Sequence, residues 1–240
     1  MTTAPATVVE ARTRTALVLV VGVLILANVV NNRVLPSWSY VPANLAEAAV
    51  LVVIARWAWT SWQELGLERR DAGAGLRWGV GAVGAVLAVY LVAVATPGLR
   101  GLFVDDGAET ASVGRLLYET LVRIPLGTVV LEEVAFRGVV LGLGARLRRW
   151  WPAAVVSSAL FGLWHVLPAA SPASANEGFE DVTSGLAGGR VAVVVAAVAA
   201  TFVAGLVFCW LRRRSGSLLA PGLLHVGTNS LGYVFAWLLA

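Results

Sequence analysis

Long runs of apolar residues recur along this 240-residue chain, and they limit its fold more than any other feature. A helix needs about 20 predominantly apolar residues to cross a bilayer. The sequence therefore predicts an all-α, polytopic integral membrane helical bundle of about seven transmembrane helices, or eight if the longest segment divides. The candidate spans lie at 15–31, 43–60, 77–97, 116–143, 152–168, 190–211 and 217–239.

The composition excludes a soluble domain of ordinary type. Apolar residues make up 58% of the chain and charged residues 13%, whereas a soluble domain carries about 25% charged residues. All 18 basic residues are arginines that sit mostly at segment ends. No stretch interleaves basic and aromatic residues as a nucleic-acid groove does, so no nucleic-acid partner is expected. With Cys209 alone, an internal disulfide is excluded.

The arginines are divided unequally between the two sets of connections, which predicts the orientation. Alternate connections carry Arg12, Arg14, Arg69, Arg70, Arg77, Arg146, Arg148, Arg149, Arg212, Arg213 and Arg214. The opposite connections carry Arg33, Arg100, Arg115 and Arg190, together with acidic runs near 105–109 and 177–181. We therefore expect a cytoplasmic N-terminus, an uncleaved first span and external loops at 98–115 and 169–189.

Several charged residues fall inside the predicted spans, where each costs at least about 2.5 kcal/mol and so suggests a function. In the run Glu132-Glu133-Val-Ala-Phe-Arg137, Glu133 and Arg137 share a helical face and can pair. Glu132 points about 100° away and lacks such a partner. Arg137 can hold one carboxylate charged and leave the other ready to accept a proton, as a general base must. A structural ion pair between helices is the alternative.

Both histidines of the chain also lie in predicted spans. Phe161 precedes His165 by one helical turn and can pack beside it, while His225 shares a face with Asn229. A lone histidine in a span is often a packing residue. Two histidines, a carboxylate pair and an asparagine on the same face together favour a catalytic site. By contrast, Glu47 has no obvious partner.

The ordered motifs E-E-x-x-x-R, F-x-x-x-H and H-x-x-x-N resemble those of the CPBP family of intramembrane proteases. That family includes the endopeptidases that cleave prenylated CaaX proteins, and bacterial members linked to bacteriocin self-protection and peptide processing. The resemblance implies a catalytic transmembrane core within 115–240, preceded by about three transmembrane helices within 1–114. No departure occurs at the motif positions.

The resemblance implies a role for each motif residue. Glu132 would activate the attacking water with help from His165, and His225 and Asn229 would donate hydrogen bonds to the oxyanion. Glu133, Arg137 and Phe161 would support them. The residue types agree with this reading, because a base, a helper and two donors are the parts of a peptide hydrolase.

Whether a metal takes part is a separate question. Glu132, His165 and His225 could bind zinc with one open position, but the H-E-x-x-H spacing typical of such sites is missing. We favour a reaction without a cofactor. A transporter or proton relay, or an idle immunity or scaffold protein, are the alternatives to an enzyme. The expected partners are the lipid bilayer and a membrane-associated peptide or protein substrate. The arginine-only, Ala/Val/Gly-rich chain suggests a bacterial plasma membrane.

Overall fold

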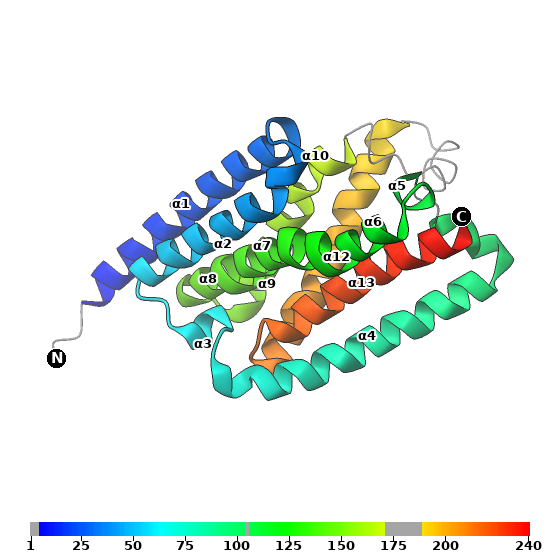
Figure 1. Ribbon diagram of the computed structural model, residues 1–240. Coiled ribbons are helices and arrows are strands. Elements are labelled where there is room, and N and C mark those ends of the chain that lie inside the picture. The colour runs from blue at the N-terminus through cyan, green and yellow to red at the C-terminus, as the bar shows by residue number, and fades with distance from the viewer. Residues whose placement is uncertain (1–4, 104–105, 171–188) are drawn as a thin grey trace.

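The computed structural model describes residues 5–103, 106–170 and 189–240. Within these residues every regular element is helical and no strand occurs. Long helices lie alongside one another in a bundle (Figure 1). These features confirm the predicted all-α membrane bundle. Most of the connection expected at 169–189, with its acidic residues, lies outside the described residues, as do 104–105.

All seven apolar runs predicted as spans are helical. They correspond to α1 (Ala6–Arg33), α2 (Tyr40–Trp57), α4 (Ala72–Ala95), a continuous helix over 113–147, α9 (Trp150–Trp164), α12 (Arg190–Ser215) and α13 (Leu219–Leu239). The shorter elements between them are η1 (Ser37–Ser39), α3 (Trp62–Leu65), η2 (Arg69–Asp71), η3 (Pro97–Phe103), α5 (Asp106–Glu109) and α10 (Val166–Ala169).

Among the residues that the structure describes, five helical segments are long and apolar enough to cross a membrane. They are Ala6–Arg33, Ser37–Trp57, Arg69–Ala95, Trp150–Ala169 and Arg190–Ser215. The other two predicted spans, 113–147 and α13, contain Glu132 and His225 with their polar neighbours. The number of membrane crossings therefore stays a prediction, while the helical character of all seven segments is established.

Apolar side chains on the outside of the bundle match a lipid environment. On α1 the buried residues follow one narrow stripe with helical spacing, namely Thr13, Ala16, Val20, Leu24, Ala27 and Asn28. The opposite face exposes Val18 (73%) and Ile25 (63%). Such an exposed apolar face would be costly in water and is stable in a bilayer.

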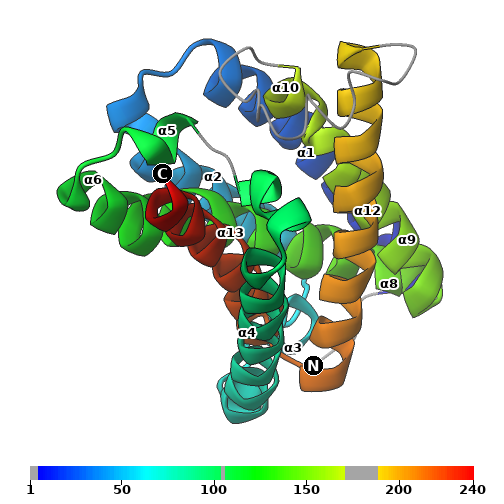
Figure 2. The same ribbon diagram turned by 90° about the vertical axis from the view of Figure 1, so that its right-hand side faces the viewer.

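Helix α4 packs closely against α13 through two glycines, Gly75 and Gly79. A Cβ atom at Gly75 would lie 2.7 Å from Ser217 Cβ, and one at Gly79 would lie 2.6 Å from Leu223 Cδ1. Small residues one turn apart let two membrane helices approach closely. In Figure 2, α4 and α13 lie beside each other for most of their length.

The predicted arginine-rich connections lie together at one end of the bundle. Arg12 Nη1 donates to the Trp57 carbonyl at 3.3 Å, and its guanidinium lies 4.0 Å from the Trp59 ring centroid. Arg146 pairs with Glu64 at 2.6 Å, and Arg212 donates to the Gln63 carbonyl at 2.9 Å. The alternate connections therefore share one end, as the arginine pattern requires. Which compartment this end faces stays a prediction.

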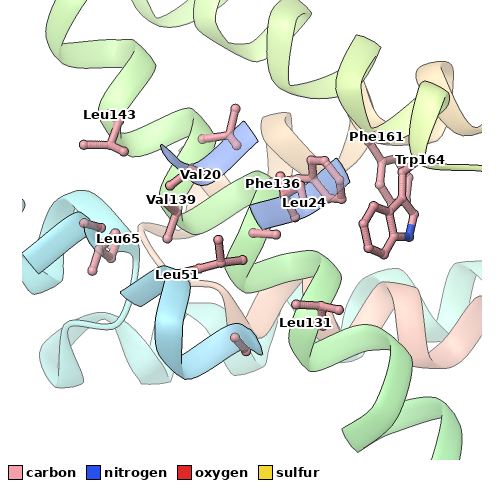
Figure 3. Close-up of a cluster of buried hydrophobic side chains, with 14 of the residues drawn as sticks. Val20, Leu24, Leu51, Leu65, Leu131, Phe136, Val139, Leu143, Phe161 and Trp164 are labelled. Carbon is pink, nitrogen blue, oxygen red and sulfur yellow. The ribbon is translucent and has the colours of Figure 1, made fainter. Parts of the chain in front are cut away.

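The bundle core surrounds the middle of the 113–147 helix. Leu131, Phe136, Val139 and Leu143 point into a buried cluster with residues of α1, α2 and α3, including Val20, Leu51 and Leu65 (Figure 3). Phe161 and Trp164 of α9 close one side of this cluster. The central helix is thus packed from several directions.

The central helix is wound more widely than an α-helix on both sides of Glu132. Its parts are α6 (Val113–Tyr118), the π-type η4 (Glu119–Val129), α7 (Val130–Glu132), the π-type η5 (Glu133–Val140) and α8 (Leu141–Leu147). The Val130 N–H donates to the Pro125 carbonyl, five residues back. Winding of this kind is rare and is found frequently at functional sites.

Candidate active site

The central helix positions two carboxylates and one guanidinium in the interior of the bundle. Glu132, Glu133 and Arg137 are 5%, 3% and 0% exposed. Arg137 Nη1 donates to Glu133 Oε1 at 3.1 Å, which confirms the predicted i, i+4 pair. Glu132 makes no such bond to Arg137, so the two adjacent carboxylates differ in their surroundings.

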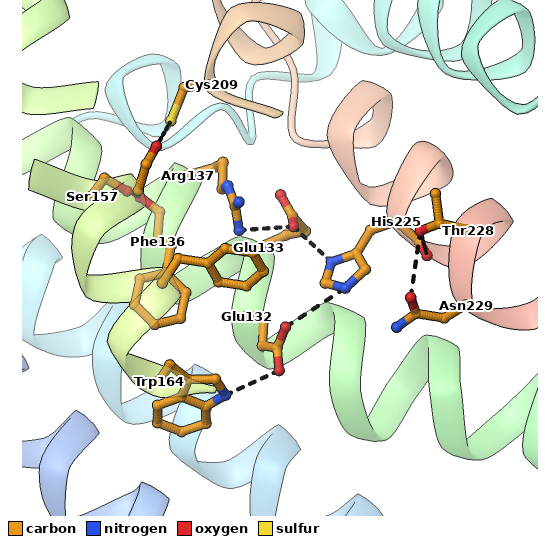
Figure 4. A network of polar contacts seen from close by, with 12 residues as sticks. Glu132, Glu133, Phe136, Arg137, Ser157, Trp164, Cys209, His225, Thr228 and Asn229 are labelled. Carbon is orange, nitrogen blue, oxygen red and sulfur yellow. Dashed lines mark hydrogen bonds and ion pairs between the residues drawn. The ribbon is translucent and has the colours of Figure 1, made fainter. Parts of the chain in front are cut away.

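His225 of α13 lies between these carboxylates (Figure 4). Its Nδ1 is 2.9 Å from Glu133 Oε1, and its Nε2 is 3.6 Å from Glu132 Oε2. An ionised carboxylate can only accept, so with Glu133 ionised this hydrogen bond requires a proton on Nδ1. The Phe208 ring stacks on the imidazole at 5.1 Å and fixes its plane. The structure therefore brings His225 and the carboxylate pair together.

Aromatic rings enclose the Arg137 guanidinium. Its central carbon lies 3.9 Å from the Phe161 ring centroid and 4.6 Å from that of Phe208. A desolvated cation over an aromatic face is stabilised by the ring quadrupole. The Phe161 ring contacts both Arg137 and His165, and the supporting role expected of it stays a prediction.

Glu132 has a partner that the sequence reasoning missed. The Trp164 indole Nε1 donates to Glu132 Oε1 at 3.0 Å in the buried interior. No hydrogen bond from the described residues reaches the other oxygen, Oε2, which is also buried. The signal available in the sequence was weak: a tryptophan in an apolar span usually directs its N–H to a partner, but nothing in the motif identifies that partner.

His165 lies at the C-terminal end of α9, where its ring packs edge-on against Phe161 at 4.7 Å. Its Nδ1 is 2.8 Å from the Phe161 carbonyl. A carbonyl accepts, so Nδ1 is the donor in this contact. Among the described residues, His165 forms no ion pair with Glu132. The neighbouring residue Trp164 contacts Glu132 instead, through its indole hydrogen bond.

Asn229 follows His225 by one turn of α13 and is exposed. Its Oδ1 accepts a hydrogen bond of 3.4 Å from Thr228 Oγ1. The structure therefore joins Glu132, Glu133, Arg137 and His225 directly, while His165 and Asn229 lie outside this set of contacts.

A pocket of about 410 Å3 lies on the far side of Trp164, between α1 and the end of α9. Its mainly apolar wall includes Leu24, Asn28, Phe136 and Trp164. Glu132, His225 and Asn229 do not line it. This pocket therefore does not connect the motif residues with one another.

A zinc ion at this site would need several side chains to converge on one point. Three ligands must place their donor atoms about 2 Å from one point. In the part of the chain that the structure describes, no three His, Cys, Asp or Glu side chains gather in this way. The set Glu132, His165 and His225 does not fit zinc in this arrangement, since His165 stands apart.

The fold and the site together define an all-helical membrane protein with a buried cluster of two carboxylates, one guanidinium and one imidazole. Residues 115–231 match the model of the family described as Type II CAAX prenyl endopeptidase Rce1-like. This segment, about half of the chain, belongs to that family, in agreement with the resemblance seen in the three motifs. No curated protein and no solved structure matches the chain significantly.

Proposed function

We propose that this protein is an intramembrane endopeptidase that hydrolyses a peptide bond of a membrane-associated peptide or protein with a water molecule activated by Glu132. The observation that carries the proposal is the unequal environment of the two carboxylates. Glu133 Oε1 is held by both Arg137 and His225, whereas the only hydrogen bond to Glu132 from the described residues is that of the neutral Trp164 indole. The second oxygen of each carboxylate is buried without a hydrogen-bond partner from the described residues. A buried carboxylate that is not bound to Arg137 and has a free oxygen suits a general base.

The reaction would proceed in two steps. Glu132 removes one proton from water while the water oxygen attacks the peptide carbonyl carbon, and the carbonyl electron pair moves to the oxygen. The tetrahedral intermediate then collapses. The C–N bond breaks, and Glu132 returns the proton to the leaving nitrogen. The products are one carboxylic acid and one amine, so the base is regenerated.

Charge on the intermediate needs donors close to the new oxyanion. His225 is suited to this role, because Glu133 fixes its Nδ1 and a second proton on Nε2 would make the ring a cation between two carboxylates. With Arg137, that cation would balance both carboxylates. Asn229 would supply the second donor from the next turn of α13. His165, whose Nδ1 is held by the Phe161 carbonyl, would assist Glu132 in orienting the water.

The substrate is proposed at the level of its chemistry. The site lies in a bundle with apolar outer faces, so a membrane-inserted peptide segment is the form of substrate that can reach it. We propose a bacterial plasma membrane with the N-terminus in the cytoplasm, and a reaction that needs no metal ion.

The test is cleavage of a library of membrane-inserted peptides in proteoliposomes, with and without a prenylated C-terminal cysteine. We expect the wild-type protein to release defined fragments and Glu132→Gln to release none. Glu47→Gln is the matched control, since Glu47 lies on α2 and bonds to Asn31. Equal cleavage by the wild type and Glu132→Gln would refute the proposal, as would no cleavage by either.

A further inference from the structure

The two oxygens of the Glu132 carboxylate have different partners. Oε1 accepts the indole hydrogen bond from Trp164 at 3.0 Å. Oε2 faces His225 Nε2 at 3.6 Å and has no hydrogen-bond donor among the described residues. A hydrogen bond to an ionised acceptor is about twice as strong as a neutral one. The indole therefore fixes which oxygen points toward His225.

Trp164 is itself fixed from two sides. Its ring packs against Phe136 with centroids 5.9 Å apart, and its side chain is 9% exposed. Its carbonyl accepts a hydrogen bond of 2.7 Å from Asn28 Nδ2, a side chain that is 8% exposed. The last carbonyls of a helix lack partners within that helix. Trp164 is the last residue of α9, so Asn28 supplies the hydrogen bond that the Trp164 carbonyl lacks within the helix.

Asn28 belongs to α1, outside the segment 115–231 that matches the family. The contacts thus form a continuous path from α1 to the base: Asn28 to the Trp164 carbonyl, and the Trp164 indole to Glu132. Trp164, through which this path runs, directly precedes His165 in the sequence. This path gives the N-terminal helices a connection to the site that their apolar sequence does not reveal.

We infer that Trp164 is a positioning residue that holds the Glu132 carboxylate with Oε2 toward the reacting water, and that Asn28 holds Trp164 in place. The inference rests on the proposed function of Glu132 as the base. Without the indole donor, the carboxylate rotates among several orientations and presents the correct oxygen for a smaller fraction of the time. The substrate is still bound, because neither residue has to contact it.

The first test compares Trp164→Phe with Trp237→Phe. Both changes remove an indole donor and keep an aromatic ring, but Trp237 donates to the Ala111 carbonyl. We expect Trp164→Phe to lower kcat about tenfold, the scale of one hydrogen bond to a charged group, with KM within about twofold. Trp237→Phe should leave both constants unchanged. Unchanged kcat in Trp164→Phe, or an equal loss in Trp237→Phe, would overturn the inference.

The second test uses the coupling between the two residues. If Asn28 acts through Trp164, Asn28→Leu lowers kcat less than Trp164→Phe, and the double variant is no slower than Trp164→Phe alone. Residues on one path give such non-additive effects, whereas independent sites add. Additive losses would show that Asn28 acts by another route and would overturn that part of the inference.

A third readout needs no substrate. The infrared carboxylate bands of Glu132 are those that disappear in Glu132→Gln. Loss of the indole donor should shift these bands in Trp164→Phe and leave them unchanged in Trp237→Phe. If the wild-type protein cleaves no peptide, the proposed function fails, but the bands still decide whether Trp164 holds the carboxylate. Identical bands in wild type and Trp164→Phe would overturn the positioning role.

Discussion

His225 Nδ1 lies 2.9 Å from Glu133 Oε1, at the point where that oxygen also accepts the Arg137 guanidinium. One carboxylate oxygen thus links a histidine of α13 to an arginine of the central helix. This relationship is the reason for the proposal that Glu133 holds the site together and that Glu132 acts as the base.

Glu132→Gln should remove activity and preserve the fold. The amide keeps the shape of the side chain and can still accept the Trp164 hydrogen bond, but it cannot take a proton from water. We expect the cleavage rate to fall about 100-fold or more, the scale of general-base catalysis. The melting temperature in detergent should stay close to that of the wild type. A variant that unfolds would contradict the assignment.

Glu133→Gln should cost stability as well as rate. It leaves the fully buried Arg137 without its carboxylate partner, and breaking a buried pair costs on the order of 3 kcal/mol. Thermal or denaturant unfolding in detergent measures this loss. If Glu133→Gln is stable but inactive while Glu132→Gln unfolds, the roles of the two carboxylates are reversed.

Arg137→Met should destabilise the protein by a similar amount, about 3 kcal/mol. Combined with Glu133→Gln, it should cost less than the two separate losses added, because the double variant buries no unpaired charge. A double-mutant cycle of unfolding free energies gives this coupling. Simple additivity would show that the 3.1 Å contact contributes little to stability.

Protonation of Glu64 should lower the stability of the folded protein in acid. This residue lies outside the membrane-spanning segments. Burial raises the pKa of Glu64, but hydrogen bonds from Arg146 and Ser61 outweigh it, so the pKa is lowered overall. A carboxyl with a lowered pKa stabilises the fold above its unfolded pKa, about 4.3. That contribution disappears as the pH falls through the folded value.

Melting curves at a series of pH values check this effect. Glu64→Gln should melt below the wild type at pH 7, and the difference should shrink as the pH falls below about 4. The expected effect is small because the Glu64 side chain is 35% exposed. Glu10→Gln, which removes a carboxylate from an exposed pair with Arg14, is the control. A difference in melting temperature that grows as the pH falls would contradict this prediction.

The arginine-rich end should face the cytoplasm. Reporter fusions placed in the connection 144–151 should report a cytoplasmic location, and fusions near 98–103 an external one. The structure puts Arg12, Arg146 and Arg212 at one end, so all three connections must give the same answer. An external signal from 144–151 would reverse the orientation of the whole bundle.

Removal of metal should leave the activity intact. Because Glu132, His165 and His225 do not gather as ligands, we expect cleavage to survive dialysis against a chelator. Elemental analysis of the purified protein should give zinc well below one equivalent. Stoichiometric zinc, together with activity that is lost on chelation and restored by zinc, would replace the proposed mechanism by a metal-dependent one.

The sequence was sufficient where an interaction is local. The spacing of Glu133 and Arg137 predicted their pair, and the spacing of Phe161 and His165 predicted their ring contact; both are present. Helical spans could be placed from apolar runs because lipid leaves few other structures possible. The Glu119–Arg123 pair follows from the same i, i+4 rule.

Contacts between helices could not be derived in this way. Glu47 had no partner along its own helix, and the structure gives it Asn31 of α1 at 3.0 Å. Trp164 reaches Glu132 across 32 residues, which no periodicity encodes. The relation of His165 to Glu132 depends on where α9 ends, and helix ends are the least certain feature of a sequence pattern.

The wide turns on either side of Glu132 have a consequence for how this helix tolerates insertions and deletions. A π-type turn holds about one residue more than an α-helical turn, so removing one residue from 119–129 or 133–140 would favour ordinary winding and keep the two halves of the helix in phase. Removing one residue from an α-helical stretch such as α8 would instead turn the residues beyond it by about 100°. The wide turns are therefore the places in this helix where a one-residue deletion is expected to change the direction of the Glu132 carboxylate least.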